Sequence, residues 1–285
     1  MMGDPVMSVN STPETPEIGK SIEVGDLKIN YHDLGEGEVV LLIHGSGPGV
    51  TGWANWRGVI PGLANEFRVI APDMAGFGYT STASDVSCST AYWAEQLLLL
   101  VDALDVPTFS IVGNSFGGSI ALEFVRRYPD RCNKVVLMGA VGVSFPLTDG
   151  LDAVWGYEPS HDAMRHLLRV FVANKDMISD DLVEMRYRAS VRPGVQERFS
   201  ALFPAPRQRW IEALAQDPEV LRQIRHQVLL IHGYEDEVIP FAASEHLVSL
   251  LPNARLERID RCGHWVQIEQ AEQFNKILGE FLSAP

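Results

Sequence analysis

The sequence predicts an α/β fold with a mostly parallel central sheet, helices on both faces of the sheet, and an inserted helical cap. Three observations lead to this prediction. Short, continuously apolar runs recur along the chain, which is typical of strands buried on both faces. Amphipathic stretches separate these runs, as in successive β-α-β units. From about Phe145 to Pro218 the strand pattern stops and only helical patterns occur.

The predicted strands follow one another after an edge hairpin. Residues 21–32 alternate in polarity and turn near Gly25 and Asp26, which favours an antiparallel hairpin at the sheet edge. Buried strands are predicted at residues 39–43, 67–71, 109–112, 134–138, 227–231 and 254–259. Polar or glycine-rich loops follow these strands. In a parallel sheet such loops meet at one edge, where ligands bind.

Helical patterns fill the gaps between the strands. In the core they cover residues 89–106, 116–131 and 268–282, and in the insert they cover 162–172, 180–191, 196–202 and 206–215. The expected organisation is therefore a flexible N-terminal tail at 1–17, a first core part at 18–144, a helical cap or lid at 145–218, and a second core part at 219–285.

Composition and charge narrow the classes of function. The chain has 23 Lys and Arg against 37 Asp and Glu, a net charge of −14, which disfavours nucleic acid or anionic membrane as partners. An anionic small substrate is still allowed, because it needs only one local cation. Cys88, Cys132 and Cys262 share no metal-binding spacing, and no apolar run approaches the ~20 residues of a membrane span. We expect a cytoplasmic protein with no metal and no organic cofactor.

The segment "GNSFGG" contains the first candidate catalytic residue. Ser115 follows a predicted strand and precedes a predicted helix, which is the context of a nucleophile elbow. A plain glycine-rich turn that lets a helix pack on the sheet is the alternative for this segment. A serine nucleophile needs a base and an orienting acid. His264 lies after the last predicted strand, and Asp236, with its neighbours Glu235 and Glu237, lies after the fifth.

The same reaction needs hydrogen-bond donors for an oxyanion. The backbone N–H of Phe116, directly after the nucleophile, is one candidate, and that of Ser46 in the "HGSGPG" loop is the other. A simple glycine-rich turn is the alternative for this loop. His44 and His232 each precede a glycine at a strand end, and we expect them to be structural hydrogen-bonding residues rather than catalysts.

The motifs "LLIHGSGPGVTGWANWR", "IVGNSFGG", "GLDAVWGYEPS" and "RCGHWVQIEQ" together resemble the α/β-hydrolase superfamily and, within it, the meta-cleavage product hydrolases. The resemblance is closest to the group of 2-hydroxymuconate-semialdehyde hydrolase and its relatives for alkyl-substituted products. It implies the α/β-hydrolase fold, with the cap inserted before the strand that bears the acid. It also implies Asp236 as that acid, because the family places an Asp four residues after the His of "HG".

The resemblance implies a small dienoate substrate with a carboxylate at one end and an aldehyde or ketone at the other. Its polar subsite maps onto Asn55, Asn114, Arg186 and Trp265, and the apolar end is expected among Ala140, Val141, Leu151, Trp155 and Val238. Taken alone, Arg186 is more typical of a solvated cap residue, and Asn114 is equally typical of a turn. Family members are commonly dimeric, so a homodimer is expected.

The implied reaction is hydrolysis of a carbon–carbon bond in a ring-fission product of a catechol, within aromatic catabolism. A carboxylesterase with the same triad is the main alternative, and it predicts turnover of simple aryl esters without a need for Arg186. A non-catalytic receptor built on a hydrolase fold is a third reading. Labelling of Ser115 by an active-site serine probe would separate it from the two enzymes.

Overall fold

The protein is described here by a computed structural model that covers residues 15–82, 86 and 89–284. Residues 1–14 of the expected tail lie outside the described residues. The next residues are held in place: His32 Nε2 donates to the Pro16 carbonyl (3.0 Å), and Asn30 Nδ2 donates to the Glu17 carbonyl (3.0 Å). The chain is therefore anchored to the core before Ile18, earlier than the sequence suggested.

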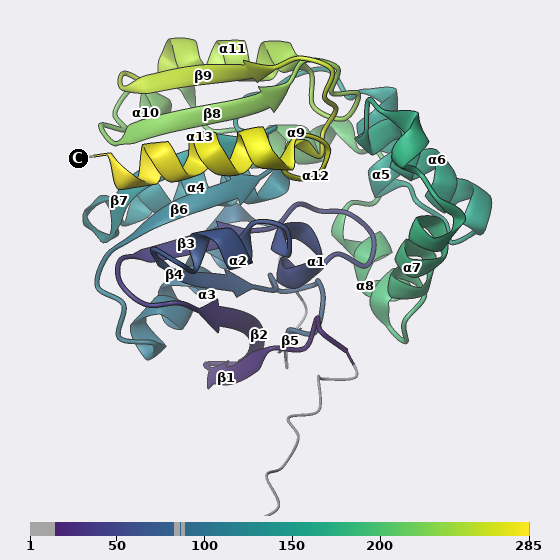
Figure 1. The fold of residues 1–285 in the computed structure, drawn as a ribbon, viewed down its shortest axis with the longest axis horizontal. Coiled ribbons are helices and arrows are strands. Elements are labelled where there is room, and N and C mark those ends of the chain that lie inside the picture. Colours follow the sequence, from purple (N-terminus) through teal and green to yellow (C-terminus); the bar gives the residue numbers. More distant parts are fainter. Residues whose placement is uncertain (1–14, 83–85, 87–88, 285) are drawn as a thin grey trace, which may run out of the picture.

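A nine-stranded sheet forms the centre of the molecule, with the order β1-β2-β4-β3-β6-β7-β8-β9 and β5 paired to β2. The strands β3, β4 and β6 to β9 are parallel, which confirms the predicted fold class (Figure 1). The antiparallel hairpin of β1 and β2 lies at one edge, also as predicted. The strands are β1 (Lys20–Val24), β2 (Leu27–Leu34), β3 (Val39–Ile43), β4 (Arg68–Pro72), β5 (Ser81–Thr82), β6 (Phe109–Asn114), β7 (Cys132–Met138), β8 (Gln227–Gly233) and β9 (Ala254–Ile259).

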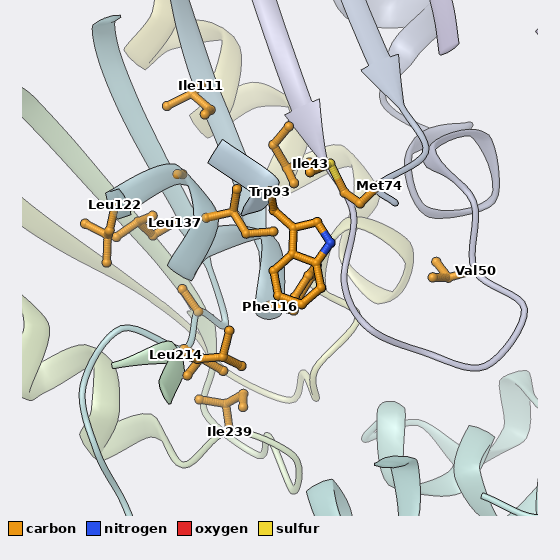
Figure 2. Close-up of a cluster of buried hydrophobic side chains, with 14 of the residues drawn as sticks. Ile43, Val50, Met74, Trp93, Ile111, Phe116, Leu122, Leu137, Leu214 and Ile239 are labelled. Carbon is orange, nitrogen blue, oxygen red and sulfur yellow. The ribbon is translucent and has the colours of Figure 1, made fainter. Parts of the chain in front are cut away.

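Helices cover both faces of the sheet. One apolar cluster packs α3 (Thr90–Ala103), α4 (Phe116–Arg127) and α11 (Phe241–Leu250) against one face. A second cluster packs α1 (Gly52–Trp56), α2 (Ile60–Leu63) and α13 (Ala271–Ser283) against the other. Figure 2 shows the first cluster, in which Trp93 and Phe116 meet edge to face with ring centroids 4.6 Å apart. These aromatic contacts fix α4, and with it the turn that precedes α4.

The chain between β7 and β8 forms helices and no strand among its described residues. They are α5 (Asp149–Trp155), α6 (His161–Phe171), α7 (Asp180–Ser190), α8 (Val195–Leu202), α9 (Gln208–Leu214) and α10 (Pro218–Leu221), with a 3₁₀ turn at Lys175–Met177. In Figure 1, α5 to α8 lie beyond the carboxyl ends of the parallel strands. A second 3₁₀ turn, Pro129–Arg131, joins α4 to β7.

The helix predictions were incomplete. The sequence did not predict α5, α11 or the short helices α1 and α2, and the expected last helix is divided into α12 (Val266–Glu269) and α13. Within the described part of the chain, no helix has both the length and the apolar character needed to cross a membrane.

Candidate active site

Ser115 lies in a sharp turn between β6 and α4. Its backbone has φ 53° and ψ −116°, a conformation that a residue with a side chain rarely adopts. Neighbouring backbone holds it there, because Ser115 N donates to the Met138 carbonyl (2.8 Å) and Val141 N donates to the Ser115 carbonyl (3.1 Å). A strained serine fixed in this way at the end of a parallel strand matches the nucleophile-elbow geometry.

The glycines around Ser115 are required by close approach of backbone. A Cβ on Gly113 would lie 2.4 Å from the Gly117 carbonyl oxygen, and one on Gly117 would lie 2.5 Å from the Ile43 carbonyl oxygen. Both separations are far shorter than a carbon and an oxygen tolerate. The glycine cluster therefore does what both sequence readings proposed: it packs α4 tightly on the sheet and permits the strained turn.

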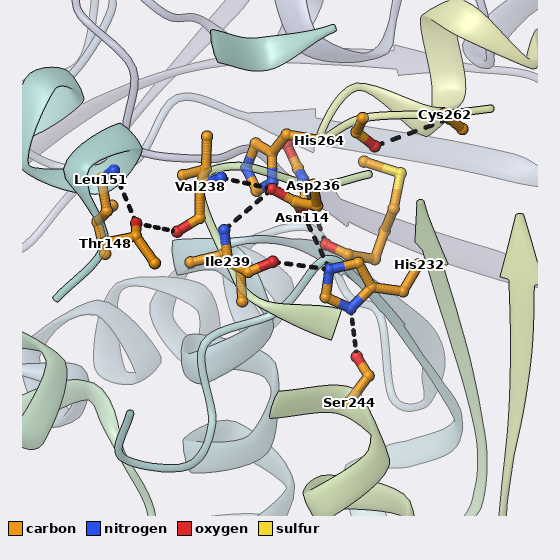
Figure 3. Close-up of polar contacts among 12 residues, drawn as sticks. Asn114, Thr148, Leu151, His232, Asp236, Val238, Ile239, Ser244, Cys262 and His264 are labelled. Atoms are coloured by element: carbon orange, nitrogen blue, oxygen red, sulfur yellow. Dashed lines mark hydrogen bonds and ion pairs between the residues drawn. The ribbon is translucent and has the colours of Figure 1, made fainter. Parts of the chain in front are cut away.

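Asp236 and His264 form a buried pair beside this turn. His264 Nδ1 and Asp236 Oδ2 are 2.7 Å apart, and Figure 3 draws the two side chains next to each other. Burial by itself would raise the pKa of Asp236, but the charge of His264 and the hydrogen bonds from His232 and His264 outweigh it and hold that pKa below its usual value. No hydrogen bond joins the Ser115 hydroxyl to a described residue, while Ser115 and His264 line the same cavity. Such contacts are often long in a free enzyme and tighten with substrate.

The two other acids of this loop have different partners. Glu235 Oε2 accepts from Cys262 N (2.9 Å), and Glu237 Oε1 pairs with Lys175 Nζ (3.0 Å) near the surface. Among the three neighbouring carboxylates, the structure brings only Asp236 to His264.

Two backbone N–H groups are in place as candidate oxyanion donors. Phe116 begins α4, so its N–H has no acceptor within the helix. Ser46 N has no hydrogen-bond partner among the described residues, and Ser46 lines the cavity together with Ser115. The Ser46 hydroxyl is already engaged, because it accepts from Trp155 Nε1 at 2.9 Å.

One cavity collects most of the candidate residues. It lies between the strand ends and the helices α5 to α7, so side chains from the core and from the insert share it. The predicted residues that line it are Ser46, Asn55, Asn114, Ser115, Leu151, Arg186, Val238, His264 and Trp265.

Arg186 marks the polar part of this cavity. It forms no ion pair with a described carboxylate, and its guanidinium lies 5.8 Å from the ring of Trp265. Burial lowers the pKa of Arg186, and so do the charges of Arg57 and Arg192, while that of Glu17 raises it. Asn55 Nδ2 is also buried without a described partner. The cavity thus holds a cationic fork whose hydrogen-bonding capacity remains available.

Three predicted pocket residues do not line the cavity. Ala140 is fully buried behind the turn, where a Cβ on Gly118 would lie 2.3 Å from the Ala140 Cβ. Val141 is fully buried too, and its N–H binds the Ser115 carbonyl. Trp155 stacks on Phe203 with ring centroids 4.5 Å apart and 12° between planes. Core packing occupies these three side chains, and Trp155 contacts the site through Ser46, so their assignment to the apolar end of the substrate stays a prediction.

Sequence reasoning missed several cavity residues. The ring of Phe171 on α6 stacks on that of Trp265, with centroids 4.6 Å apart, and on that of His264, with centroids 5.9 Å apart. The insert therefore contacts the candidate base His264 directly. Gln267 lines the cavity, and its Oε1 is buried without a described partner. Glu17, assigned to the tail, also lines it. Of these three residues, only Gln267 could have been identified from the sequence, because it lies within the "CGHWVQ" motif.

Metal binding has no candidate site in the described part of the chain, where no group of three or more His, Cys, Asp or Glu side chains gathers in a suitable arrangement.

Comparisons with known proteins place this geometry among hydrolases. A family model described as the alpha/beta hydrolase fold matches residues 38–271. The chain is 51% identical over 268 residues to a 2-hydroxy-6-oxo-2,4-heptadienoate hydrolase of Pseudomonas putida F1, covering 94% of this chain and 97% of that relative. It is 48% identical over 275 residues to a 2-hydroxymuconate semialdehyde hydrolase of Pseudomonas sp. CF600, covering 96% and 97% of the two chains.

Solved structures agree with the sequence relatives. The meta-cleavage product hydrolase CumD of Pseudomonas fluorescens IP01, solved as a serine-to-alanine mutant complexed with acetates, matches this chain with a TM-score of 0.93. The two are 48% identical, and the match covers 94% of this chain and 98% of CumD.

Proposed function

The chain belongs to the alpha/beta hydrolase fold family, and from this premise we propose that it is a serine-dependent hydrolase of a carbon–carbon bond. Its substrate is a meta-ring-fission product, either 2-hydroxymuconate semialdehyde or a 6-alkyl 2-hydroxy-6-oxohexa-2,4-dienoate. The products are 2-hydroxypenta-2,4-dienoate and a carboxylic acid. The names of the relatives at 51% and 48% identity support both the reaction and this range of substrates.

One observation carries the proposal. A single cavity is lined by the strained Ser115 with His264 and, elsewhere on its wall, by Arg186 without a carboxylate partner among the described residues. A dienoate has the two matching features, an electrophilic carbonyl and a carboxylate. A guanidinium binds a carboxylate with two parallel hydrogen bonds, which fixes orientation as well as affinity.

The reaction proceeds in two stages. First the dienol ketonises: its hydroxyl loses a proton and a ring-derived carbon gains one, so that the later leaving group is a stabilised carbanion. Then Ser115, or a water activated by His264, adds to the aldehyde or ketone carbonyl at the end of the substrate opposite the carboxylate. The carbon–carbon bond breaks, and its electron pair goes to the dienolate. Overall one water is consumed, with hydroxyl on the acyl carbon and hydrogen on the dienoate.

The proposed residue roles follow from this scheme. Asp236 orients His264 and stabilises the imidazolium formed when His264 accepts a proton. The N–H groups of Ser46 and Phe116 hold the oxyanion. The substrate carboxylate is bound by Arg186 with help from the polar residues Asn55, Asn114 and Trp265. Leu151 and Val238 are proposed to contact the apolar end of the substrate, and residues 145–218 to act as a cap over the cavity, since Leu151, Phe171 and Arg186 all line it.

The test is loss of the visible absorbance of the yellow ring-fission product of catechol, with products identified by mass. Rapid bleaching to a hydroxypentadienoate and formate is expected, or cleavage of the 3-methylcatechol product if a ketone is preferred. A Ser115→Ala variant should retain only a trace of turnover. Near-normal turnover by that variant would remove Ser115 as the nucleophile. Turnover of a nitrophenyl ester with no cleavage of either dienoate would favour a carboxylesterase.

Two further properties belong to this proposal. A cytoplasmic location is supported by the unpaired, buried thiols of Cys132 and Cys262, which fit a reducing compartment. A homodimer is inferred from the resemblance to the meta-cleavage product hydrolases. Light scattering on the purified protein measures the mass of the assembly directly, and a mass near that of one 31.5 kDa chain would exclude the dimer.

A further inference from the structure

His232 is a fully buried histidine in contact with the candidate catalytic acid. It lies at the end of β8, one residue before Gly233. Its Nδ1 is 2.7 Å from Ser244 Oγ on α11, while its Nε2 is 3.0 Å from Asp236 Oδ2 and 3.1 Å from the Ile239 carbonyl (Figure 3). The sequence predicts a structural role for His232, and the proposed mechanism assigns it no part in the reaction.

The neighbours of His232 determine where its proton lies. Both groups facing Nε2 are acceptors, a carboxylate and a carbonyl, so Nε2 carries the hydrogen and donates. Nδ1 faces a hydroxyl, and Ser244 can donate to it. His232 thus directs the N–H of Nε2 at Asp236.

Asp236 receives donors on both oxygens. Its Oδ1 accepts from the backbone N–H groups of Val238 (2.7 Å) and Ile239 (2.9 Å). Its Oδ2 accepts from His232 on one side and from His264 (2.7 Å) on the other. Without His232, Oδ2 would have His264 as its only side-chain donor, and the carboxylate would be less restrained in that direction.

We propose that His232 is a positioning residue of the catalytic site, which fixes the plane of the Asp236 carboxylate and sets the basicity of His264 through it. The inference rests on the proposed role of Asp236 and His264. An N–H donor on Oδ2 offsets part of the negative charge that would otherwise act on His264. Removing it strengthens the attraction of Asp236 for a protonated His264.

Among the described residues packed around His232 and Asp236, no lysine or arginine side chain forms an ion pair with Asp236. His232 packs against the ring of Phe241 at 5.5 Å, and Ser244 is the polar group that α11 presents to it. From the loop after β9, the facing groups are His264 and the buried Cys262 thiol, whose pKa is raised by burial and by the nearby charges of Glu269, Asp236 and Glu235. Among these residues, His232 is the side-chain donor to Asp236 besides His264.

Two isosteric substitutions separate positioning from structure. In His232→Gln the side-chain amide nitrogen can take the place of Nε2 and still donate to Asp236. In His232→Asn the amide reaches only the place of Nδ1, so the contact with Ser244 can survive while the donor to Asp236 is lost. His44→Gln is the matched control, because His44 is an equally buried "HG" histidine whose hydrogen bonds within the described chain go to the backbone of Gly45 and Met74.

The readout is the pH dependence of kcat/KM on the ring-fission product, measured alongside the rate at which a fluorophosphonate labels Ser115. We expect His232→Asn to lower both rates about tenfold to a hundredfold, the value of one hydrogen bond to a charged group. We expect its acid limb to move to higher pH by about half to one unit. His232→Gln and His44→Gln should keep the acid limb of the wild type.

The results distinguish this inference from the proposed function. Equal losses in the Asn and Gln variants with unmoved acid limbs, or an Asn variant with wild-type rates, would overturn the positioning role. If the wild type labels at Ser115 but cleaves no dienoate, the proposed function fails, and the pH dependence of labelling still decides the role of His232.

Discussion

Replacing Arg186 by Gln tests the polar end of the cavity while leaving the Ser115 end intact. Arg186 lies on α7, its guanidinium forms no ion pair with a described carboxylate, and it lines the cavity shared with Ser115 and His264. The proposed partner of this guanidinium is the substrate carboxylate. The substitution removes the fork and leaves a shorter, neutral polar side chain, so the loss reports on both charge and reach.

The expected magnitude follows from the bonds involved. A bidentate guanidinium–carboxylate pair makes two charge-assisted hydrogen bonds, each worth about 1.5–3 kcal/mol. Binding also strips water from Arg186, which is only partly buried in the free protein, so we take the lower end, about 3 kcal/mol in total. That corresponds to a loss of about a hundredfold in kcat/KM on a dienoate. Arg186→Lys keeps the charge without the fork and should lose about tenfold.

The assay compares two substrates on the same preparations. Bleaching of the dienoate should show these losses, whereas hydrolysis of a neutral nitrophenyl ester should change by less than about twofold, because an ester has no carboxylate to bind. Equal losses on both substrates would mean that Arg186 supports the fold of the cap rather than the substrate. No loss on the dienoate would refute the carboxylate subsite itself.

Three further changes test packing and electrostatics. Gly117→Ala should lower the free energy of unfolding by about 1–3 kcal/mol, because its Cβ would meet backbone, whereas Gly62→Ala, with nothing within 4 Å, should be neutral or gain up to about 1 kcal/mol. Trp155→Phe should cost about 1 kcal/mol by removing the bond to Ser46. Burial lowers the pKa of His44 from 6.5 to about 4, so its contribution to stability is present above pH 6.5 and is lost as pH falls to 4. Across that window the wild type should lose about 3 kcal/mol more than His44→Gln.

Urea unfolding followed by circular dichroism measures all three effects. A Gly117→Ala protein as stable as the Gly62→Ala control would contradict the close backbone approach at the turn. An unchanged midpoint in Trp155→Phe would mean that the Ser46 bond carries no net free energy. Parallel pH profiles of wild type and His44→Gln would show that His44 titrates alike in the folded and unfolded chains.

The strand framework could be predicted because it depends on local pattern. A run such as Val39–Ile43 is apolar at every position, and this property alone indicates a strand buried on both faces. The helix α5 was missed, since Gly150 lies within its seven residues and weakens the helical pattern. The last helix was predicted without its interruption at Gln270, where φ is −126°, because the sequence remains amphipathic across that point.

The residues of the candidate site show the same difference between local pattern and long-range contact. Ser115, Asp236 and His264 each follow a predicted strand, so parallel pairing alone brings them to one edge of the sheet. Phe171 and Glu17 reach the cavity through contacts between distant segments, which no local pattern records. Ala140 and Val141 follow β7 and are near the site in sequence, but their side chains face the core. Their place in the sequence predicted that these two residues lie near the site, but it did not predict the direction of their side chains.

The two ends of the described chain have opposite relations to the cavity. Glu17 lines it, and the Glu17 carboxylate lies 3.4 Å from Arg192, next to α7. The C-terminal helix α13 runs away from α5 to α8 and ends at the far side of the sheet, where Lys134 Nζ donates to the carbonyls of Phe281 and Leu282 (Figure 1). An enzyme tethered to a support or fused to a partner through its C-terminal end would therefore present an unobstructed cavity, whereas attachment just ahead of Glu17 would crowd it.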